Sequence, residues 1–437
     1  MEIKEGSKVR IKVKGNFYEG IVMPKTKQSK ENVLVIKLQN GYNVGFDTDD
    51  IEDIEILQES HKIAYLPKEI EFSKVEGRKS ISIIGCGGTI ASRVEYRTGA
   101  VIAAFSPDDL ILSFPELREI ANIDGRKIFD LMSEDMTSHH WKIIAEEVYK
   151  EIKKDVDAVI LTHGTDTMHF TSAALSFALQ NLSIPIILVG AQRSSDRPSS
   201  DNYLNLLSAS YFAVNSNVSE VLVCMHGATN DDYCYLHRGT RVRKMHTSRR
   251  DAFKSINSLP LAKVDYFEKK IEYLLDNYKT VDKSRKVELI NDFNENVGLI
   301  YVFPNIKPEF ISSLSKFFDG IVLAVTGLGH VPVNYNKNPF TKSILNEIKN
   351  LIDSNIPVVV APQTFYGRLN LKVYAPGRLL LETNIIGDDM DWLPEVAFVK
   401  LSWALAQTKD MKRIREIMYT NYANEFSLTT DVRNFYY

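Results

Sequence analysis

The sequence has 437 residues, of which 44% are hydrophobic and 25% are charged, and its formal net charge is −3. A chain of this length exceeds one ordinary hydrophobic core, so we expect a globular protein with two or three domains. The near-neutral charge excludes a protein that binds nucleic acid or membranes through its overall charge, so any nucleic-acid contact must come from a local patch or another subunit.

The three cysteines show no C-x-x-C spacing, which indicates a reducing compartment rather than a disulfide framework. Residues 1–6 lack the apolar core of a secretory signal. No apolar stretch approaches the roughly 18 residues that span a bilayer. We therefore expect a cytoplasmic protein.

Residues 1–58 show the pattern of short strands joined by turns. Residues Lys8–Val13 alternate polar and apolar side chains, as a half-buried strand does. Asn40-Gly41 is a hairpin signal between two further apolar runs. The pattern predicts a small SH3-like β-barrel, a module that more often docks or recognises than catalyses.

Residues 79–270 change to apolar strands separated by amphipathic helices. Strands are predicted over Ile81–Ile84, Ala158–Leu161, Ile184–Val189 and Val221–Met225. Helices are predicted between them, for example over His140–Ile152 and Phe170–Gln180. Continuous apolar strands spaced by helices are typical of a parallel sheet covered on both faces. The fold class is therefore α/β, with this region as the larger α/β domain.

A polar segment, Phe267–Val297, is predicted to be a linker to a second, smaller α/β domain over 296–437. The strands of that domain are predicted over Gly298–Phe303, Gly320–Val325 and Val358–Ala361. Its last long helix is predicted to start near Pro394, because proline suits the first helical position.

Two glycine-flanked threonines follow predicted strands of the larger domain. Residues 87–91 read GGTIA and residues 162–167 read THGTDT. A tight glycine turn after a buried strand places a hydroxyl at the edge of a parallel sheet. Each threonine alone could merely cap the next helix. As a pair, with a carboxylate beside one of them, the hydroxyls favour nucleophilic chemistry.

The first glycine loop does not fit a phosphate-binding motif. Ile90 stands where a dinucleotide fingerprint needs its third glycine, and no lysine follows Gly88 as a P-loop requires. The pair His139-His140 points to different helix faces, so we interpret it as structural. We expect no metal site, because no His, Cys and Asp cluster has ligand spacing.

A threonine hydroxyl needs a neighbouring group to draw off its proton. Tyr96 follows Thr89 in a segment with a glycine hinge, and Lys244 stands in a basic stretch over 241–247. A lysine can act as a base when it is desolvated or held near other cations. The basic stretch alone could equally be a solvated charged face.

These motifs carry a family resemblance over roughly residues 79–437. GGTIA, THGTDT and Val242-x-Lys244 resemble the three signatures of the asparaginase/glutaminase amidohydrolases. Within that family the chain resembles most closely the D subunits of archaeal tRNA-dependent amidotransferases that form Gln-tRNA(Gln). The segments that carry this second resemblance are residues 92–101, 133–136 and 190–198, together with the added N-terminal module.

The resemblance implies a two-domain asparaginase-like α/β fold with parallel sheets and a role for each motif residue. Thr89 is implied to be the nucleophile that becomes acylated, and Tyr96 to close over it. Thr165 is implied to be the second hydroxyl, which Lys244 helps to deprotonate. Asp166 is implied to bind the α-ammonium group of the substrate.

The remaining implied residues bind the substrate. Ser133 is implied to hold the α-carboxylate. Glu134 follows Ser133 at a position where the family usually has glutamine. The resemblance therefore does not imply that this chain has the substrate preference of an asparaginase. Gly88 and Gly164 lie in turns whose backbone N–H groups can stabilise the tetrahedral oxyanion.

The resemblance also implies a partner. The chain would hydrolyse glutamine and pass ammonia to an E subunit, which would hold ATP and Mg²⁺ and contact tRNA(Gln), within a heterotetramer built on a homodimer of this chain. This chain itself is expected to hold no cofactor. The alternatives are a free cytoplasmic L-asparaginase, against which the N-terminal module and the 267–297 segment argue, and a binding module without catalysis.

Overall fold

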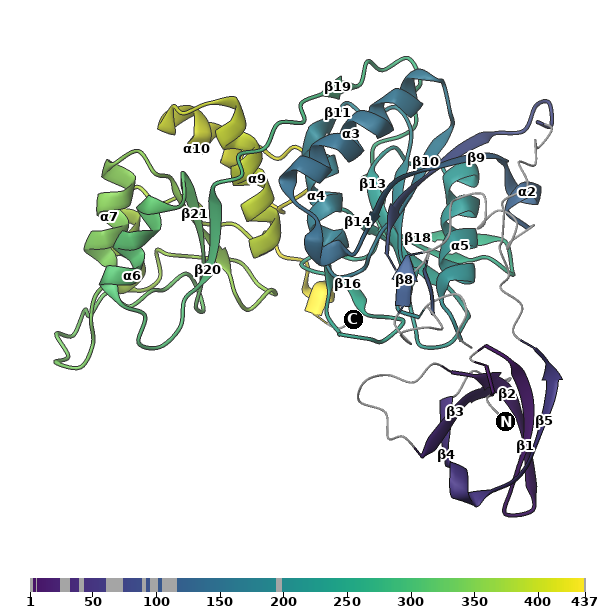
Figure 1. The fold of residues 1–437 in the computed structure, drawn as a ribbon. Helices are drawn as coiled ribbons and strands as arrows, with labels where there is room; N and C mark the ends of the chain where they lie inside the picture. Colours follow the sequence, from purple (N-terminus) through teal and green to yellow (C-terminus); the bar gives the residue numbers. More distant parts are fainter. Residues whose placement is uncertain are drawn as a thin grey trace.

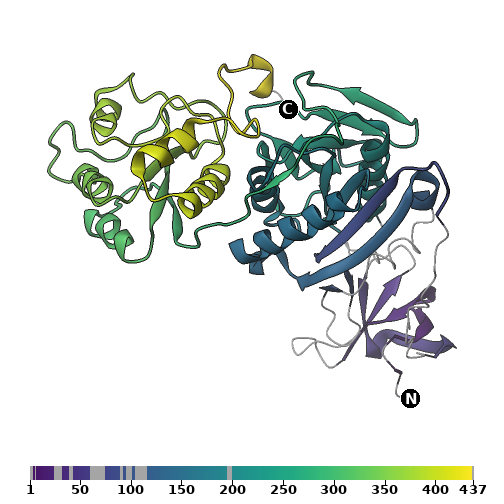
Figure 2. The same ribbon diagram turned by 90° about the horizontal axis from the view of Figure 1, so that it is seen from above.

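A computed structural model describes residues 3–4, 6–23, 32–38, 43–59, 74–88, 92–94, 101–103, 116–193 and 199–435 of the protein. The larger α/β domain lies between the small N-terminal sheet and the smaller C-terminal α/β domain (Figure 1). The same order is seen when the molecule is viewed from above (Figure 2). In the described part of the chain, no helix combines the length and apolarity needed to cross a bilayer.

The N-terminal part is a five-stranded antiparallel sheet in the order β4-β3-β2-β1-β5. Its elements are β1 (Lys8–Val13), β2 (Asn16–Val22), β3 (Val33–Leu38), β4 (Asn43–Asp47), the 3-10 turn η1 (Thr48–Asp50) and β5 (Ile51–Gln58). Alternate residues of β1 are buried in its core, as the pattern predicted. The expected closed barrel is not confirmed, because β4 and β5 lie at opposite edges and no ladder joins them among the described residues.

The larger domain is built on an eight-stranded sheet in the order β18-β17-β14-β13-β12-β10-β6-β9. Five neighbouring strands are parallel: β9 (Asn122–Leu131), β6 (Ser80–Gly87), β10 (Ala158–Thr162), β12 (Ile186–Val189) and β13 (Val221–His226). Three strands are antiparallel: β14 (Cys234–Arg238), β17 (Ala262–Asp265) and β18 (Lys270–Tyr273). The sheet is therefore mixed and not wholly parallel, because a short loop and no helix joins β13 to β14.

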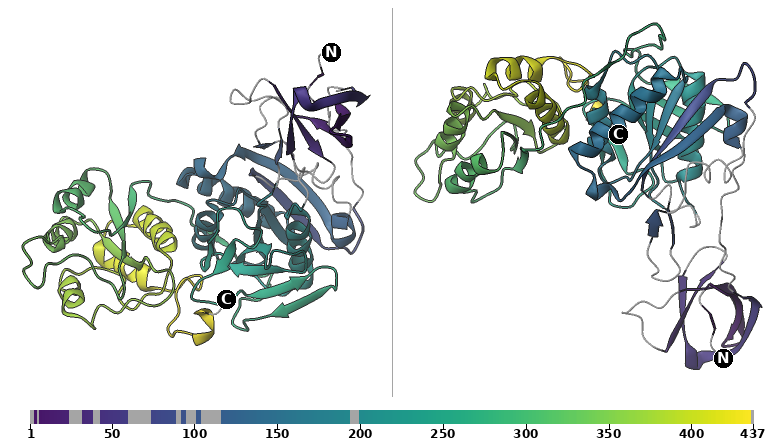
Figure 3. Two further views of the ribbon diagram at one scale, coloured as in Figure 1. Left: turned by 90° about the horizontal axis from the view of Figure 1, so that it is seen from below. Right: turned by 45° about the horizontal axis from the view of Figure 1, so that its top comes forward.

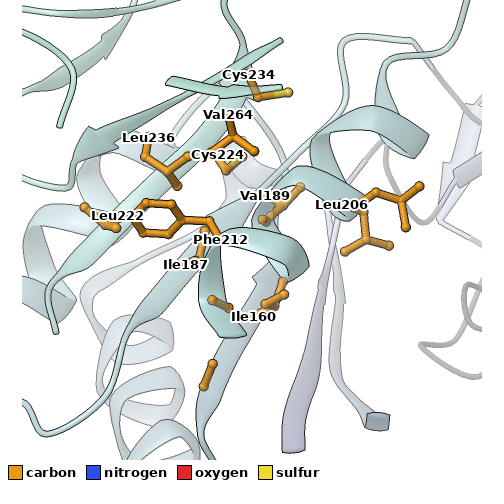
Figure 4. Close-up of a cluster of buried hydrophobic side chains, with 14 of the residues drawn as sticks. Ile160, Ile187, Val189, Leu206, Phe212, Leu222, Cys224, Cys234, Leu236 and Val264 are labelled. Carbon is orange, nitrogen blue, oxygen red and sulfur yellow. The ribbon is translucent and has the colours of Figure 1, made fainter. Parts of the chain in front are cut away.

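Helices cover both faces of this sheet. One face carries α3 (Ser138–Lys153) and α4 (Met168–Ala178), and the other carries α5 (Asn202–Asn215) and the short α2 (Glu116–Ile120). Figure 4 shows the α5 side, where Phe212 lies beside Leu222 and Ile187, in the same buried cluster as Leu206 and Ile160. Burial on both faces explains why the parallel strands are apolar throughout.

The segment 267–297 is not a free linker, which corrects the expectation from its polar composition. Lys270–Tyr273 forms the edge strand β18, and β19 (Glu288–Leu289) pairs with β11 (Leu179–Gln180). Ile271 and Tyr273 share the inner face of β18, where the Tyr273 ring lies 6.4 Å from that of Phe212, but three of the four residues are largely exposed, so the strand resembled a linker in composition.

The smaller domain has a three-stranded parallel sheet, β20 (Val297–Tyr301), β21 (Gly320–Val325) and β22 (Val358–Pro362). Its helices are α6 (Pro308–Ser313), α7 (Leu345–Asp353), α8 (Ala375–Leu381), α9 (Pro394–Gln407) and α10 (Met411–Tyr419). Pro394 stands at the start of α9, as predicted. Further short elements are β7 (Ser92–Val94), β8 (Val101–Ala103), β15 (Val242–Lys244), β16 (Phe253–Ser255), η3 (Ser133–Asp135), η4 (Leu314–Lys316) and η5 (Val432–Phe435).

The two α/β domains share one apolar core. Trp141 and Phe177 of the larger domain pack with Trp392, Val396 and Trp403 of the smaller one. After α10 the chain turns back toward the larger domain, and its end lies beside that domain in every view (Figure 3). Helix α9 therefore joins the apolar cores of the two domains.

Candidate active site

The two glycine turns meet at the edge of the large sheet. Gly88 has a φ of +85°, and a Cβ built on it would lie 2.3 Å from Gly164 N. Because β6 and β10 are parallel neighbours, their ends bring these two turns together. Gly88 and Gly164 each precede one of the two threonines. Thr89 itself and Tyr96 lie outside the described residues.

Ser133 lies against the second turn. A Cβ on Gly164 would lie 2.8 Å from Ser133 Oγ, and the serine side chain is buried. Asp166 donates its backbone N–H to Ser133 Oγ at 3.2 Å, and Thr167 Oγ1 donates to Ser133 O at 2.6 Å. A hydroxyl that accepts one hydrogen bond still has its own hydrogen to donate, for example to a carboxylate. Glu134, the next residue of η3, is exposed.

Lys244 reaches this turn from β15. Its Nζ donates to Thr165 Oγ1 at 2.9 Å and to Asp166 Oδ1 at 2.7 Å. The lysine side chain is 10% exposed and the carboxylate is 64% exposed, while Thr165 is buried. The basic stretch is therefore not a solvated face at this position, because its lysine joins a buried hydroxyl to an open carboxylate.

Two histidines near the site stay neutral at physiological pH. Burial lowers the pKa of His163 to about 4, and burial together with the positive charges of Arg243 and Lys244 lowers the pKa of His169 to about 3. His163 Nδ1 lies 2.7 Å from Gly164 O and its Nε2 lies 2.9 Å from Thr171 Oγ1. This histidine holds the second glycine turn in place through these two contacts.

The interpretation of His139-His140 as structural agrees with the helix start. His140 Nδ1 accepts the backbone N–H of Thr137 at 3.0 Å, which completes a capping box at the first turn of α3. Within the described ranges, no group of three His, Cys, Asp or Glu side chains is arranged to hold a metal ion.

The structure thus brings together six of the predicted residues: Gly88, Ser133, Gly164, Thr165, Asp166 and Lys244. It also places Arg243, the residue before the lysine, against Phe365 and Glu395 of the smaller domain. These contacts were not predicted from the sequence. The available signal was the pair of adjacent basic residues at 243 and 244, because neighbours on a strand point to opposite faces and Arg243 must find a partner other than that of Lys244.

Family models match three consecutive parts of the chain. Residues 3–57 match the GatD N-terminal domain, residues 80–278 match Asparaginase, N-terminal, and residues 296–418 match the Glutaminase/Asparaginase C-terminal domain. The match to Asparaginase, N-terminal, therefore contains all six described residues of the site.

Similar proteins match along almost their whole length. A protein of Thermococcus kodakarensis, named as the D subunit of glutamyl-tRNA(Gln) amidotransferase, is 46% identical over 94% of this chain and 90% of its own. A Pyrococcus furiosus protein of the same name is 44% identical over 100% of this chain and 95% of its own.

Solved structures show the same fold in the two α/β domains. The L-asparaginase from Thermococcus kodakarensis has a TM-score of 0.70 at 30% identity and covers 80% of this chain and 99% of its own. L-asparaginase I from Vibrio cholerae has a TM-score of 0.69 at 29% identity and covers 80% of this chain and 100% of its own. A fifth of this chain thus has no counterpart in either asparaginase.

Proposed function

The chain belongs to the family of archaeal glutamyl-tRNA(Gln) amidotransferase D subunits, and on this basis we propose its reaction and its partners. It is the glutaminase subunit of the tRNA-dependent amidotransferase that converts Glu-tRNA(Gln) to Gln-tRNA(Gln). The observation that supports this most is the contact of Lys244 Nζ with both Thr165 Oγ1 and Asp166 Oδ1, beside the paired glycine turns.

The proposed reaction has two steps. In the first, Thr89 Oγ1 attacks the side-chain carbonyl carbon of glutamine, the C–N bond breaks, and ammonia leaves with the proton of the hydroxyl. In the second, water attacks the threonine ester, which releases glutamate and restores the hydroxyl. Tyr96 closes over the nucleophile, and backbone N–H groups of the glycine turns stabilise the oxyanion in both steps.

Thr165 and Lys244 form the proton-transfer pair of this proposal. A buried hydroxyl that accepts a hydrogen bond from an ammonium group has a stabilised alkoxide form, so Thr165 can take part in moving protons. Asp166 is exposed beside it and binds the α-ammonium group, while Ser133 and Glu134 lie on the α-carboxylate side. The substrate is thus held by its α-ammonium and α-carboxylate groups, and this fixes where its side-chain amide carbon lies relative to the nucleophile.

The proposed partner is the E subunit, bound to a homodimer of this chain in a heterotetramer in the cytoplasm. ATP and Mg²⁺ would act on that subunit, which would activate the glutamate on tRNA(Gln). The formal net charge of −3 supports this division, because a chain with little excess positive charge gains little from long-range attraction to RNA.

The proposed domain bounds are 1–58, 79–270 and 296–437. The N-terminal sheet has its own apolar core, and the smaller α/β sheet has one face covered by its own helices. The 1–58 module docks the chain to a partner in this proposal, since it carries none of the described site residues.

A coupled assay of ammonia release tests the function. The purified chain alone is expected to hydrolyse glutamine slowly, and addition of the E subunit, Glu-tRNA(Gln) and ATP is expected to raise turnover. Fast asparagine hydrolysis that does not respond to these additions would instead identify a free asparaginase. No hydrolysis of either amide under any condition would identify a binding module.

A further inference from the structure

Arg243 connects the catalytic strand to the smaller domain. Its Nε donates to Glu395 Oε1 at 2.7 Å, and the centre of its guanidinium group lies 3.9 Å from the centroid of the Phe365 ring. Adjacent strand residues point to opposite faces, so Arg243 contacts the smaller domain while Lys244 reaches Thr165. The contacts of Arg243 therefore help to fix the stretch of backbone that also carries Lys244.

The loop that holds the Phe365 ring is strained and specifically anchored. Phe365 has a φ of +64°, a conformation that is costly for a bulky residue. Asn257, two residues beyond β16, donates through Nδ2 to Phe365 O at 3.0 Å and accepts the backbone N–H of Gly367 at 2.9 Å. Since β16 pairs with β15, the hairpin that carries Lys244 also holds this loop in place.

Glu395, the partner of Arg243, is buried at the same contact between the domains. Its side chain is 4% exposed in the first turn of α9, and its Oε2 has no hydrogen-bond partner among the described residues. A buried carboxylate is stable only with a matching cation, so Arg243 and Glu395 hold each other in one geometry. Helix α9 is itself packed on α4, which begins next to the catalytic turn.

We propose that Arg243, Phe365 and Glu395 form an interdomain clamp that positions Lys244 for proton transfer with Thr165. The clamp rests on the proposed glutaminase function, but none of its residues touches substrate in this proposal. Its consequence is that the orientation of the smaller domain sets the catalytic competence of the larger one. A binding event that shifts the smaller domain would change turnover through Lys244.

Three variants in the full chain test the clamp: Arg243→Gln, Arg243→Lys and Phe365→Leu. Misplacement of a catalytic group by about 1 Å can cost about a hundredfold in rate. We therefore expect Arg243→Gln and Phe365→Leu to lower kcat for glutamine by about ten- to a hundredfold with KM changed less than about threefold. Arg243→Lys keeps the charge and is expected to restore part of kcat.

The matched control is Arg126→Gln. Arg126 pairs with Glu147 and with Glu151, whose side chain is 2% exposed, in the larger domain, and its hydrogen bonds reach no described residue of the site. We expect this variant to lower the unfolding temperature as Arg243→Gln does, but to keep kcat within about twofold of the wild type. An equal loss of kcat in both variants would show that stability, and not the position of Lys244, explains the effect.

Chemical labelling of Lys244 gives a measurement that does not depend on turnover. The side chain is 10% exposed, so reductive methylation of the folded protein is expected to be slow at Lys244. It is expected to become several-fold faster in Arg243→Gln and Phe365→Leu and to stay slow in Arg126→Gln. Folded clamp variants with unchanged labelling and unchanged kcat would overturn the proposal, whereas a wild type without glutaminase activity would overturn only the function.

Discussion

Lys244 contacts two groups that differ in exposure. Thr165 is buried, whereas the Asp166 side chain is 64% exposed. An ammonium group beside a buried hydroxyl favours its deprotonated form, and an exposed carboxylate can meet an incoming ammonium group. At the scale of single residues, one lysine therefore links the chemical step to the place where substrate binds.

Replacing this lysine tests its role in proton transfer. We expect Lys244→Met to lower kcat by about 10²- to 10⁴-fold, the usual range for loss of a proton-transfer group, with a smaller change in KM. Steady-state glutamine hydrolysis measures both constants. Lys254→Met is the control, because Lys254 lies on the paired strand β16 and contacts Asp251 instead of the site. A kcat in Lys244→Met equal to that of this control would contradict the role.

The residues of the site were predictable where the signal was local. Thr165 and Asp166 follow one apolar strand within two residues of a glycine, and this spacing alone predicts a turn that places them at the edge of the sheet. The partners of Arg243 were not predictable, because Glu395 lies 152 residues further along the chain and no short pattern connects them. Such contacts depend on how the two domains pack.

At the scale of elements, the site depends on the close approach of two strand ends. Gly88 has a positive φ and nearly touches the backbone of Gly164. A side chain at either position would separate the turns that precede the two threonines. The parallel pairing of β6 and β10 brings the turns to one edge, and the missing side chains allow them to touch.

Gly88→Ala tests this approach. The added Cβ would lie 2.3 Å from Gly164 N, so we expect the turns to move apart and kcat to fall by at least about a hundredfold. Gly77→Ala is the matched control, since Gly77 has a similar φ of +76° but nothing within 4 Å of its Cβ position. The control is expected to lose about 1 kcal/mol of stability and little activity. Equal activities of the two variants would show that the contact is unimportant.

The predicted elements were most accurate where burial was most uniform. The parallel strands and the start of α9 matched, because apolar runs and an N-terminal proline are strong local signals. The edge strand β18 was missed, because its residues are mostly exposed and charged. Closure of the N-terminal sheet into a barrel was not confirmed among the described residues, because strand count does not determine whether edge strands pair.

At the scale of the whole molecule, the larger domain buries three histidines in neutral form. Burial lowers the pKa of His163 to about 4 and that of His169 and His237 to about 3. The unfolded chain takes up these protons near pH 6.5, so it binds more protons than the folded chain below that pH. The free energy of unfolding therefore falls as the pH is lowered from 7 to 5, by up to about 1.4 kcal/mol per pH unit for each histidine.

His226 works in the opposite direction. Burial opposes the charged form of His226, but contacts with Cys234 and Asp231 raise its pKa. The folded chain therefore binds this proton more readily than the unfolded chain, so His226 raises the free energy of unfolding as the pH is lowered. The combined effect of the three histidines with a lowered pKa is expected to exceed that of His226. Denaturant titrations at pH 7, 6 and 5 measure the net change of the free energy of unfolding with pH. His237→Gln is expected to make the slope shallower, because it removes one of the three groups. A stability that is constant or rises between pH 7 and pH 5 would contradict this account.

The most direct measurement concerns the nucleophile. A glutamine analogue with a diazoketone in place of its amide can alkylate the hydroxyl that attacks the substrate, and peptide mass spectrometry locates the adduct. We predict a single adduct on Thr89 that is absent in Thr89→Ala and slower to form in Lys244→Met. An adduct on Thr165, or one that persists in Thr89→Ala, would contradict the proposed threonine ester.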